Sequence, residues 1–212
     1  MQGLTDEFVD EPINVDALPA DPMTLFRDWH GKAAAHEPWL GNAMTLATTD
    51  AAGLPSARIV LLRGVDSSGF HLYTNYTSRK GRELDRKPAC ALVFWWASQV
   101  RQVRIEGTAV RLPGADSDAY FATRSRESQL GAWASPQSEV ISSRGELAER
   151  LVHYEARFKG QPVPRPVHWG GFRVCPVRME FWQGGAARLH DRLCYTCREP
   201  DRGDWTLVRL AP

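Results

Sequence analysis

Arg188, His190 and Arg192 stand two residues apart near the end of the sequence. On an extended strand, side chains alternate between the two faces, so this spacing predicts that the three side chains point the same way. Guanidinium groups bind phosphate through paired hydrogen bonds, and an imidazole exchanges protons near neutral pH. The row therefore predicts a site for a phosphorylated ligand whose reaction moves a proton. The alternative is a solvated strand face whose cations pair with carboxylates.

A second group of cations and hydroxyls lies in the first half of the chain. Its members are Arg58, Arg63, Tyr73, Thr74, Ser78, Arg79 and Lys80. Ser78 is a typical N-cap, which puts Arg79 and Lys80 in the first turn of a helix, where positive charge opposes the helix dipole. Backbone N–H groups at that end of a helix bind anions. Cations placed against the dipole indicate a phosphate site, with an ordinary surface helix as the alternative.

A third group could bind a second phosphate and the edge of a ring. Tyr120 and Arg124 are four residues apart, so they would share one face of a helix, and Ser128 follows soon after its expected end. Neutral donors and acceptors of the kind that suit a heteroaromatic ring edge are Gln102, Gln137 and Ser138. Each of these residues alone would be interpreted as a capping or surface residue.

The composition is that of a globular chain without a strong charge bias. The sequence has 212 residues, 43% of them hydrophobic, and a formal net charge of +1 from 26 Lys and Arg against 25 Asp and Glu. This balance argues against a nucleic-acid partner and against a membrane surface, so any anion site must be local. The start of the sequence is acidic, unlike a secretory signal, and no apolar run reaches the roughly 20 residues of a membrane span. We expect a cytoplasmic protein with a mobile arm over residues 1–20 and a single domain over 21–212.

The four cysteines do not form a pattern typical of a zinc site. Cys194 and Cys197 are three residues apart, and on a strand such side chains face opposite sides. Cys90 and Cys175 have no close neighbour in the sequence that could complete four ligands. We therefore expect no metal and four buried or half-buried thiols.

The apolar pattern predicts a mainly β protein with a few helices. Helices are expected over 22–35, 78–86, 115–123 and 142–159, and strands over 43–49, 57–65, 70–75, 89–97, 103–112, 172–182, 192–197 and 205–210. Strands come from both ends of the sequence, and no strand–helix–strand unit repeats. This favours an α+β fold, a closed antiparallel β-barrel with helices packed on it, over a doubly wound sheet.

From about residue 18 to residue 212, the sequence resembles the pyridoxine/pyridoxamine 5′-phosphate oxidase family, FMN-dependent enzymes of the split-barrel fold. Many ordered motifs carry the resemblance, namely Arg58-Ile-Val-Leu-Leu, Tyr73-Thr-Asn-Tyr-Thr-Ser-Arg-Lys80, Arg101-Gln102, Ser128-Gln-Leu-Gly-Ala-Trp-Ala-Ser-Pro-Gln-Ser138, Trp169-Gly-Gly-Phe-Arg, Glu180-Phe-Trp-Gln-Gly-Gly, Arg188-Leu-His-Asp-Arg192 and the final Arg209-Leu-Ala-Pro. The resemblance implies an antiparallel FMN-binding split β-barrel and a homodimer with flavin sites at the subunit interface.

The resemblance also implies a role for each residue noted above. FMN would be bound by Arg58, Ile59, Val60, Leu61, Leu62, Arg63, Tyr73, Thr74, Arg79, Lys80, Gln102, Gln137, Ser138, Trp182 and Arg192. The substrate phosphate would contact Arg63, Tyr120, Arg124 and Ser128, while Arg188 and His190 would lie over the pyridine ring and act in catalysis. The implied reaction is the oxidation of pyridoxine or pyridoxamine 5′-phosphate to pyridoxal 5′-phosphate by O2, with release of H2O2.

Three features depart from the family pattern and keep alternatives open. Arg63 stands in place of a lysine, so a broad planar guanidinium replaces a compact ammonium group. Ser125 stands in place of a proline. The acidic start of the sequence lacks the Arg- and Tyr-containing segment that covers the substrate in some members. One alternative is a related flavin oxidase for another aromatic substrate, such as the phenazine-forming branch. Another is a non-catalytic carrier of FMN or pyridoxal phosphate. A nucleic-acid module using Trp95 and Trp96 is disfavoured by the net charge and by the core-like sequence around them.

Overall fold

The structure is a computed structural model that describes residues 12–38, 40–197 and 203–212. The prediction of a mobile arm over 1–20 falls partly on residues 1–11, which lie outside the described residues. The rest of that segment includes a short 3-10 helix, η1 (Val15–Ala17), and Ile13 N–H donates to Asp191 Oδ2 at 2.7 Å. Residues 12–20 thus contact the C-terminal part of the sheet.

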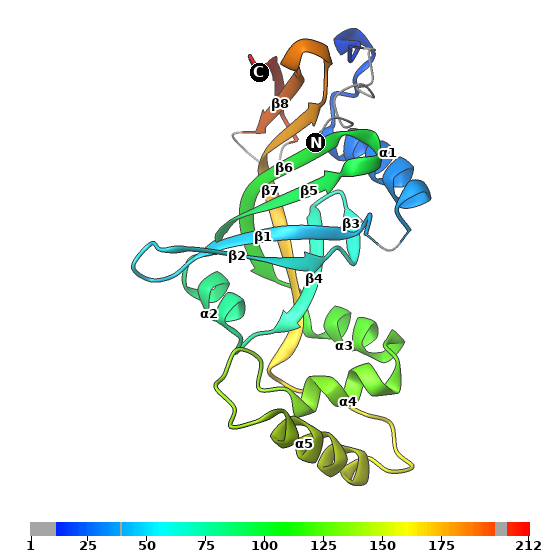
Figure 1. The fold of residues 1–212 in the computed structure, drawn as a ribbon, viewed down its shortest axis with the longest axis vertical. Coiled ribbons are helices and arrows are strands. Elements are labelled where there is room, and N and C mark those ends of the chain that lie inside the picture. The colour runs from blue at the N-terminus through cyan, green and yellow to red at the C-terminus, as the bar shows by residue number, and fades with distance from the viewer. Residues whose placement is uncertain (1–11, 39, 198–202) are drawn as a thin grey trace.

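Within the described residues, the strands form one antiparallel sheet of nine strands (Figure 1). They are β1 (Ala43–Thr49), β2 (Pro55–Leu61), β3 (Gly64–Asp66), β4 (Gly69–Asn75), β5 (Ala89–Trp96), β6 (Arg101–Arg111), β7 (Trp169–Gln183), β8 (Asp191–Cys197) and β9 (Trp205–Arg209). The order is β2-β1-β5-β6-β7-β4-β3, while β8 pairs with β7 and β9 with β8. Strands from both ends of the chain therefore meet in one sheet, which confirms the predicted class. The order of the described strands ends at β2 and β3, so the barrel is split, as the resemblance implies, rather than closed.

The helices lie around this sheet. They are α1 (Pro22–His36), α2 (Arg79–Arg86), α3 (Gly114–Thr123), α4 (Arg126–Ala134) and α5 (Arg144–Arg157), with short 3-10 helices η2 (Ala97–Gln99) and η3 (Ala186–Arg188). The sequence pattern does not predict α4. The cap of α4 is Ser125, whose Oγ accepts from Ser128 N–H at 3.3 Å. The serine at the family's proline position thus begins a helix here.

The core fills the inner face of the curled sheet, where α1 packs. The ring of Phe26 on α1 lies 4.8 Å from that of Phe70 and 5.1 Å from that of Phe94, and all three side chains are fully buried. Because neighbours on a strand face opposite sides, Trp96 is buried while Trp95 is 51% exposed on the outer face. The interpretation of both tryptophans as core residues is therefore wrong for Trp95.

A second, smaller core joins the helices α3, α4 and α5 to the lower end of the sheet in Figure 1. Its buried members are Phe121, Leu130, Phe158, Val163 and Trp169. Leu151 and Tyr154 of α5 pack against this cluster, as the spacing of apolar residues in the sequence predicts.

Two segments differ from the predicted strands for identifiable reasons. The expected strand over 57–65 is divided into β2 and β3, because Leu62 N–H donates to Asn42 O at 2.8 Å while Arg63 N–H donates to His71 O at 2.9 Å, which moves the chain from β1 to β4. The other difference concerns Arg188 and His190. The chain leaves β7 at its end, turns through η3 and enters β8 only at Asp191, so the predicted alternation of 188, 190 and 192 on one strand is wrong.

The thiols are buried or half-buried, as predicted. Cys194 and Cys197 are buried, and Cys90 and Cys175 are half-buried. Among the described residues, no group of three or more His, Cys, Asp and Glu could hold a metal ion. None of the helices in the described ranges combines the length and apolar character that spanning a bilayer requires.

Candidate active site

Lys80, Thr74 and Gln137 meet at the beginning of α2. Lys80 Nζ donates to Gln137 Oε1 at 2.8 Å, and Thr74 Oγ1 donates to the same oxygen at 3.1 Å. Burial lowers the pKa of Lys80, and the neighbouring Arg58 lowers it further. A half-buried ammonium beside the N–H groups of a helix start is a favourable place for an anion. We call the following residues the cradle: Arg58, Thr74, Arg79, Lys80 and Gln137.

Both arginines of the cradle are held by Glu83, a buried carboxylate that the sequence analysis did not single out. Its Oε2 accepts from Arg58 Nη2 at 3.2 Å, and its Oε1 accepts from Arg79 Nε at 2.8 Å. The hydroxyls of Thr48 and Ser56 donate to Oε2 at 2.5 and 2.8 Å. Burial alone would raise the pKa of Glu83, but these hydrogen bonds outweigh it and lower the pKa to about 2. The feature of the sequence that could have indicated this role of Glu83 is its i,i+4 spacing from Arg79.

A row of side chains crosses four neighbouring strands on the outer face of the sheet. We call it the outer row, and its members in order from β5 to β8 are Trp95, Gln102, Trp182 and Arg192. Each member lies directly opposite the next, and opposite residues of antiparallel strands share a face at about 5 Å. The structure thus brings together Gln102, Trp182 and Arg192, for which the resemblance implies contacts to the flavin. It adds the exposed Trp95, for which the sequence predicts a core position.

Arg188 and His190 lie in the loop that follows β7, beside the outer row. The ring of His190 is 4.6 Å from that of Trp182, and its Nδ1 accepts from Gly185 N–H at 3.1 Å. A Cβ on Gly185 would lie 2.4 Å from Leu189 O, so this tight loop requires glycine there. Arg188 is exposed and has a φ of 63°, which non-glycine residues rarely adopt. Such strained residues occur most often at functional sites.

Arg124 lies against an aromatic stack that includes Tyr120, and Arg63 is close enough to act on Arg124 electrostatically. The ring of Tyr73 stacks on that of Tyr120 at 3.8 Å and on that of Trp169 at 5.6 Å. The Arg124 guanidinium lies 4.7 Å from the centre of the Trp169 ring, and its Nη1 is buried without a hydrogen-bond partner in the described part of the chain. Burial lowers the pKa of Arg124, Tyr120 opposes this, and Arg63 lowers it further. A buried N–H group without a partner, next to a second cation, is a place for an anion.

One of three further predicted residues, Arg124, departs from the place that the sequence pattern indicated. Arg124 is the C-cap of α3 in an extended conformation, so it does not share a helix face with Tyr120. Ser128 is in the first turn of α4, with its Oγ 2.9 Å from that of Ser125. Ser138 is exposed and has a φ of 72°, directly after Gln137 of the cradle.

The cradle and the outer row face different sides of the sheet. Arg58 of β2 pairs with Leu46, which is fully buried on the inner face. Its neighbours point the other way, because Ile59 and Leu61 are 65% and 40% exposed, whereas Val60 is half-buried and Leu62 is buried. Within one chain, therefore, the two groups predicted to bind one flavin do not converge.

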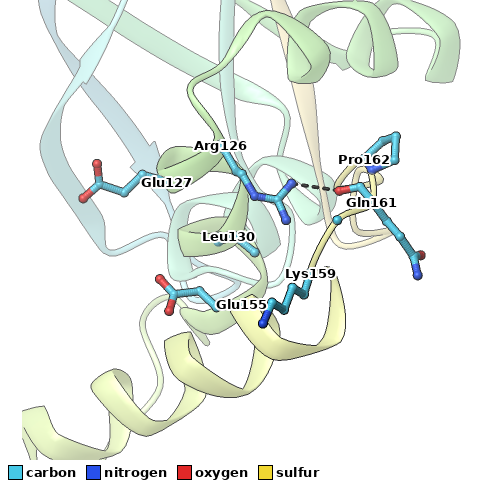
Figure 2. A pocket seen from close by; sticks show the side chains of 8 residues that line it. Arg126, Glu127, Leu130, Glu155, Lys159, Gln161 and Pro162 are labelled. Carbon is cyan, nitrogen blue, oxygen red and sulfur yellow. Dashed lines mark hydrogen bonds between the residues drawn. The ribbon is translucent and has the colours of Figure 1, made fainter.

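An open groove of about 750 Å³ lies between α4 and the end of α5 (Figure 2). Arg126 closes one side by donating to Gln161 O at 2.8 Å and to Phe158 O at 2.6 Å. The groove carries both signs of charge and contains none of the predicted site residues. It is therefore separate from the candidate site.

Comparison with known protein families accounts for most of the sequence. Residues 36–156 match a family described as "Pyridoxamine 5'-phosphate oxidase", and residues 169–212 match the "Pyridoxine 5'-phosphate oxidase C-terminal dimerisation region". A pyridoxine/pyridoxamine 5′-phosphate oxidase of Salinibacter ruber is 52% identical over 100% of this chain and 99% of its own length. One from Acaryochloris marina is 54% identical over 91% of this chain and 87% of its own length.

Solved structures share the same architecture. PhzG from Burkholderia lata, crystallised with tetrahydrophenazine-1-carboxylic acid, is 31% identical with a TM-score of 0.87, covering 96% of this chain and 99% of that one. An FMN-binding, pyridoxamine 5′-phosphate oxidase-related protein from Nostoc punctiforme is 17% identical with a TM-score of 0.71, covering 88% and 97%. The second likeness concerns the fold alone.

Proposed function

The chain belongs to the pyridoxine/pyridoxamine 5′-phosphate oxidase family, and from this premise we propose its activity. It is an FMN-dependent oxidase that converts pyridoxine 5′-phosphate, pyridoxamine 5′-phosphate or both to pyridoxal 5′-phosphate, with O2 as acceptor. The observation that carries this proposal is the presence of two separate groups of cations, the cradle and the surroundings of Arg124, each of which suits an anion. Two such sites suit a reaction between two phosphorylated aromatic molecules.

The cradle fits the phosphate of FMN in charge and in donor chemistry. Arg58, Arg79 and Lys80 carry three positive charges and Glu83 one negative, which leaves +2 against a phosphate monoester of nearly −2 at neutral pH. The backbone N–H groups at the start of α2 are further hydrogen-bond donors to the phosphate. Because they are uncharged, no additional charged group has to lose its water when the phosphate binds. Bound FMN would supply the redox chemistry of the reaction, namely uptake of a hydride from C4′ of the substrate and transfer of the electrons to O2 to form H2O2.

The substrate phosphate is held by Arg124 together with Arg63, Tyr120 and Ser128. The buried Nη1 of Arg124 gains the partner that it lacks among the described residues, and Trp169 keeps the guanidinium plane fixed. Such anchoring of a remote phosphate restricts the position of the reacting carbon, and that restriction lowers the entropic part of the barrier.

Arg188 and His190 orient the pyridine ring and help to remove the proton that leaves the substrate during its oxidation. The N–H of Gly185 can only donate, so Nδ1 of His190 is an acceptor and the neutral ring carries its proton on Nε2. The loop around Gly185 thereby fixes the tautomer before the substrate binds. Arg188 adds a positive charge that would stabilise negative charge developing on the substrate as its proton leaves.

The match to a C-terminal dimerisation region supports a homodimer. We propose further that the flavin lies between the subunits, with the cradle of one chain opposite the outer row of its partner. This arrangement would unite the two groups that face different sides of the sheet in one chain. Residues 21–212 would act as one domain, because β7, β8 and β9 complete the sheet that β1 begins. The cytoplasmic location stays a prediction.

A purified preparation tests the proposed activity directly. The expected result is a yellow protein that consumes O2 in the presence of pyridoxine or pyridoxamine 5′-phosphate and releases one H2O2 for each aldehyde formed. Bound flavin without O2 uptake on either vitamer would identify a carrier instead. Turnover of a reduced phenazine carboxylate but of neither vitamer would favour the activity suggested by the likeness to PhzG.

Arg188→Leu tests the role of the loop. We expect kcat to fall about a hundredfold or more in the FMN-saturated variant, because the guanidinium that orients the ring is lost while the cradle is intact. Flavin affinity, measured by fluorescence, should change much less. Unchanged turnover at saturating FMN would contradict the role of Arg188.

A further inference from the structure

Two groups from separate parts of the chain hold the side chain of Arg192, the last member of the outer row. Its Nε donates to Glu180 Oε1 at 2.9 Å, and its Nη1 donates to the carbonyl of Ala211 at 2.9 Å. Two anchors on one planar guanidinium determine its orientation. Among the described residues, these contacts engage Nε and Nη1, so Nη2 is the nitrogen that they leave for a ligand.

The first anchor is rigid because Glu180 is itself fixed. Its side chain is only 4% exposed, and Arg104 Nη1 donates to its Oε2 at 3.3 Å. Arg178 Nη2 lies 3.8 Å from the same oxygen. Glu106 binds these two arginines on their other side, at 3.5 and 2.9 Å, but does not contact Arg192 in the described structure. Glu180 is therefore held in place by groups that are independent of the ligand.

The second anchor is the backbone that follows β9. Leu210 N–H donates to the carbonyl of Arg192 at 2.8 Å and so continues the ladder between β8 and β9 by one residue. This contact fixes the chain where it passes Arg192 and presents the next carbonyl, that of Ala211, to the guanidinium. The tail thus contacts both the backbone and the side chain of Arg192.

We propose that Glu180 and the Ala211 carbonyl are positioning groups, which hold the Arg192 guanidinium in the direction needed to contact the flavin. The inference rests on the proposed function, since it assumes that Arg192 binds FMN. Long side chains lose rotamer entropy when a ligand immobilises them, and a guanidinium that is already immobilised avoids that loss. Neither residue needs to touch the flavin for this effect.

The affinity for FMN, measured by fluorescence quenching on the apoprotein, tests the first anchor. We expect Glu180→Gln to weaken FMN binding about tenfold or more, because an amide replaces the charge-assisted acceptor of Arg192. Glu106→Gln is the matched control, because it removes a carboxylate from the same cluster without a contact to Arg192 in the described structure. Equal affinities for the two variants, each shown to be dimeric and folded, would overturn the proposal.

Truncation tests the second anchor without changing the cluster. Removing Ala211 and Pro212 deletes the accepting carbonyl, and we expect FMN affinity to fall several-fold. Removing Pro212 alone leaves Ala211 with a carboxylate, which is a stronger acceptor, so affinity should be retained. A loss of the same size in both truncated proteins would show that the tail acts in some other way and would contradict the proposal.

A double-mutant cycle separates positioning through Arg192 from a general structural effect. In the Arg192→Gln background, Glu180→Gln should cause little further loss of FMN affinity, because the group that it positions is gone. Additive losses would overturn the positioning role. If Arg192→Gln alone leaves FMN affinity unchanged, the assignment of Arg192 to the flavin site fails, which is a different outcome from a failure of the anchors.

Discussion

Glu83 and Glu180 are both buried carboxylates that hold arginines, but their surroundings differ. Glu83 lies on α2 and accepts from two hydroxyls as well as from Arg58 and Arg79. Glu180 lies on β7 among guanidinium groups of three arginines, namely Arg104, Arg178 and Arg192. The hydroxyls belong to Thr48 on β1 and Ser56 on β2, and each donates to Glu83 and accepts from Arg58. They therefore connect Glu83 to the sheet, whereas the guanidinium partners of Glu180 can only donate.

The two sites also differ in how much water reaches the arginines that lie on strands. Of the arginines bound to Glu83, Arg58 on β2 is 20% exposed and Arg79 on α2 is 58% exposed, while the strand arginines around Glu180 are 27% to 41% exposed. Water can therefore solvate the arginines around Glu180 if the carboxylate is lost, but it can do so much less around Arg58. The comparison suggests that Glu83 contributes mainly to folding stability at the cradle, and Glu180 mainly to the direction of Arg192.

Glu83→Ala should have the largest effect and would sharpen this comparison. Removing one partner of a buried ion pair leaves the other charge uncompensated, so we expect a loss of about 3–5 kcal/mol in the free energy of unfolding. Urea denaturation at neutral pH measures it. Glu180→Ala should cost clearly less in the same assay, and equal losses would show that exposure of the arginines does not distinguish the two sites.

Acid should weaken the protein through Glu83. The pKa of Glu83 is about 2 in the folded protein against 4.5 as its ordinary value. A lowered folded-state pKa adds stability above pH 4.5, and that stability is lost as the pH falls from about 4.5 towards 2, on the order of 3 kcal/mol in all. The urea midpoint of the wild type should therefore drop between pH 5 and pH 3 by more than that of Glu83→Gln. Parallel curves for the two proteins would contradict the lowered pKa.

The smallest effect is expected at Asp85, two residues further along α2. Arg111 donates to this carboxylate at 2.6 and 2.9 Å, but the two side chains are 51% and 33% exposed. Asp85→Asn should cost less than about 1 kcal/mol, and 1 M salt should abolish most of that cost. A loss in the free energy of unfolding as large as that of Glu83→Ala would mean that the difference in burial does not determine how much each carboxylate stabilises the protein.

The sequence predicted the cations of the site better than the groups that hold them. Arg58, Lys80 and Arg192 stand out by charge and by motif, but an acid such as Glu83 on a short helix cannot be distinguished from a solvated surface residue until the sheet beneath it is known. The outer row depends on the register of four strands, which one sequence does not determine.

The misplaced loop had a visible signal. Two glycines, Gly184 and Gly185, precede Arg188, and glycine pairs mark turns rather than continuous strands. A single strand that carries Arg188, His190 and Arg192 would have to continue directly out of that turn, and the chain instead passes through η3. The chemistry of the three residues could still be inferred, because it depends on residue type rather than on the direction of each side chain.

The opposite orientation of the cradle and the outer row has a genetic consequence. If each flavin is shared between two subunits, a chain with a damaged cradle and a chain with a damaged row are both inactive alone but can rescue each other. Their mixed dimer contains one site built from the two undamaged halves. Random pairing of equal amounts should restore about a quarter of the sites in a wild-type population. Co-expression of Arg58→Ala and Arg192→Ala chains in a strain that requires pyridoxal phosphate would then restore growth.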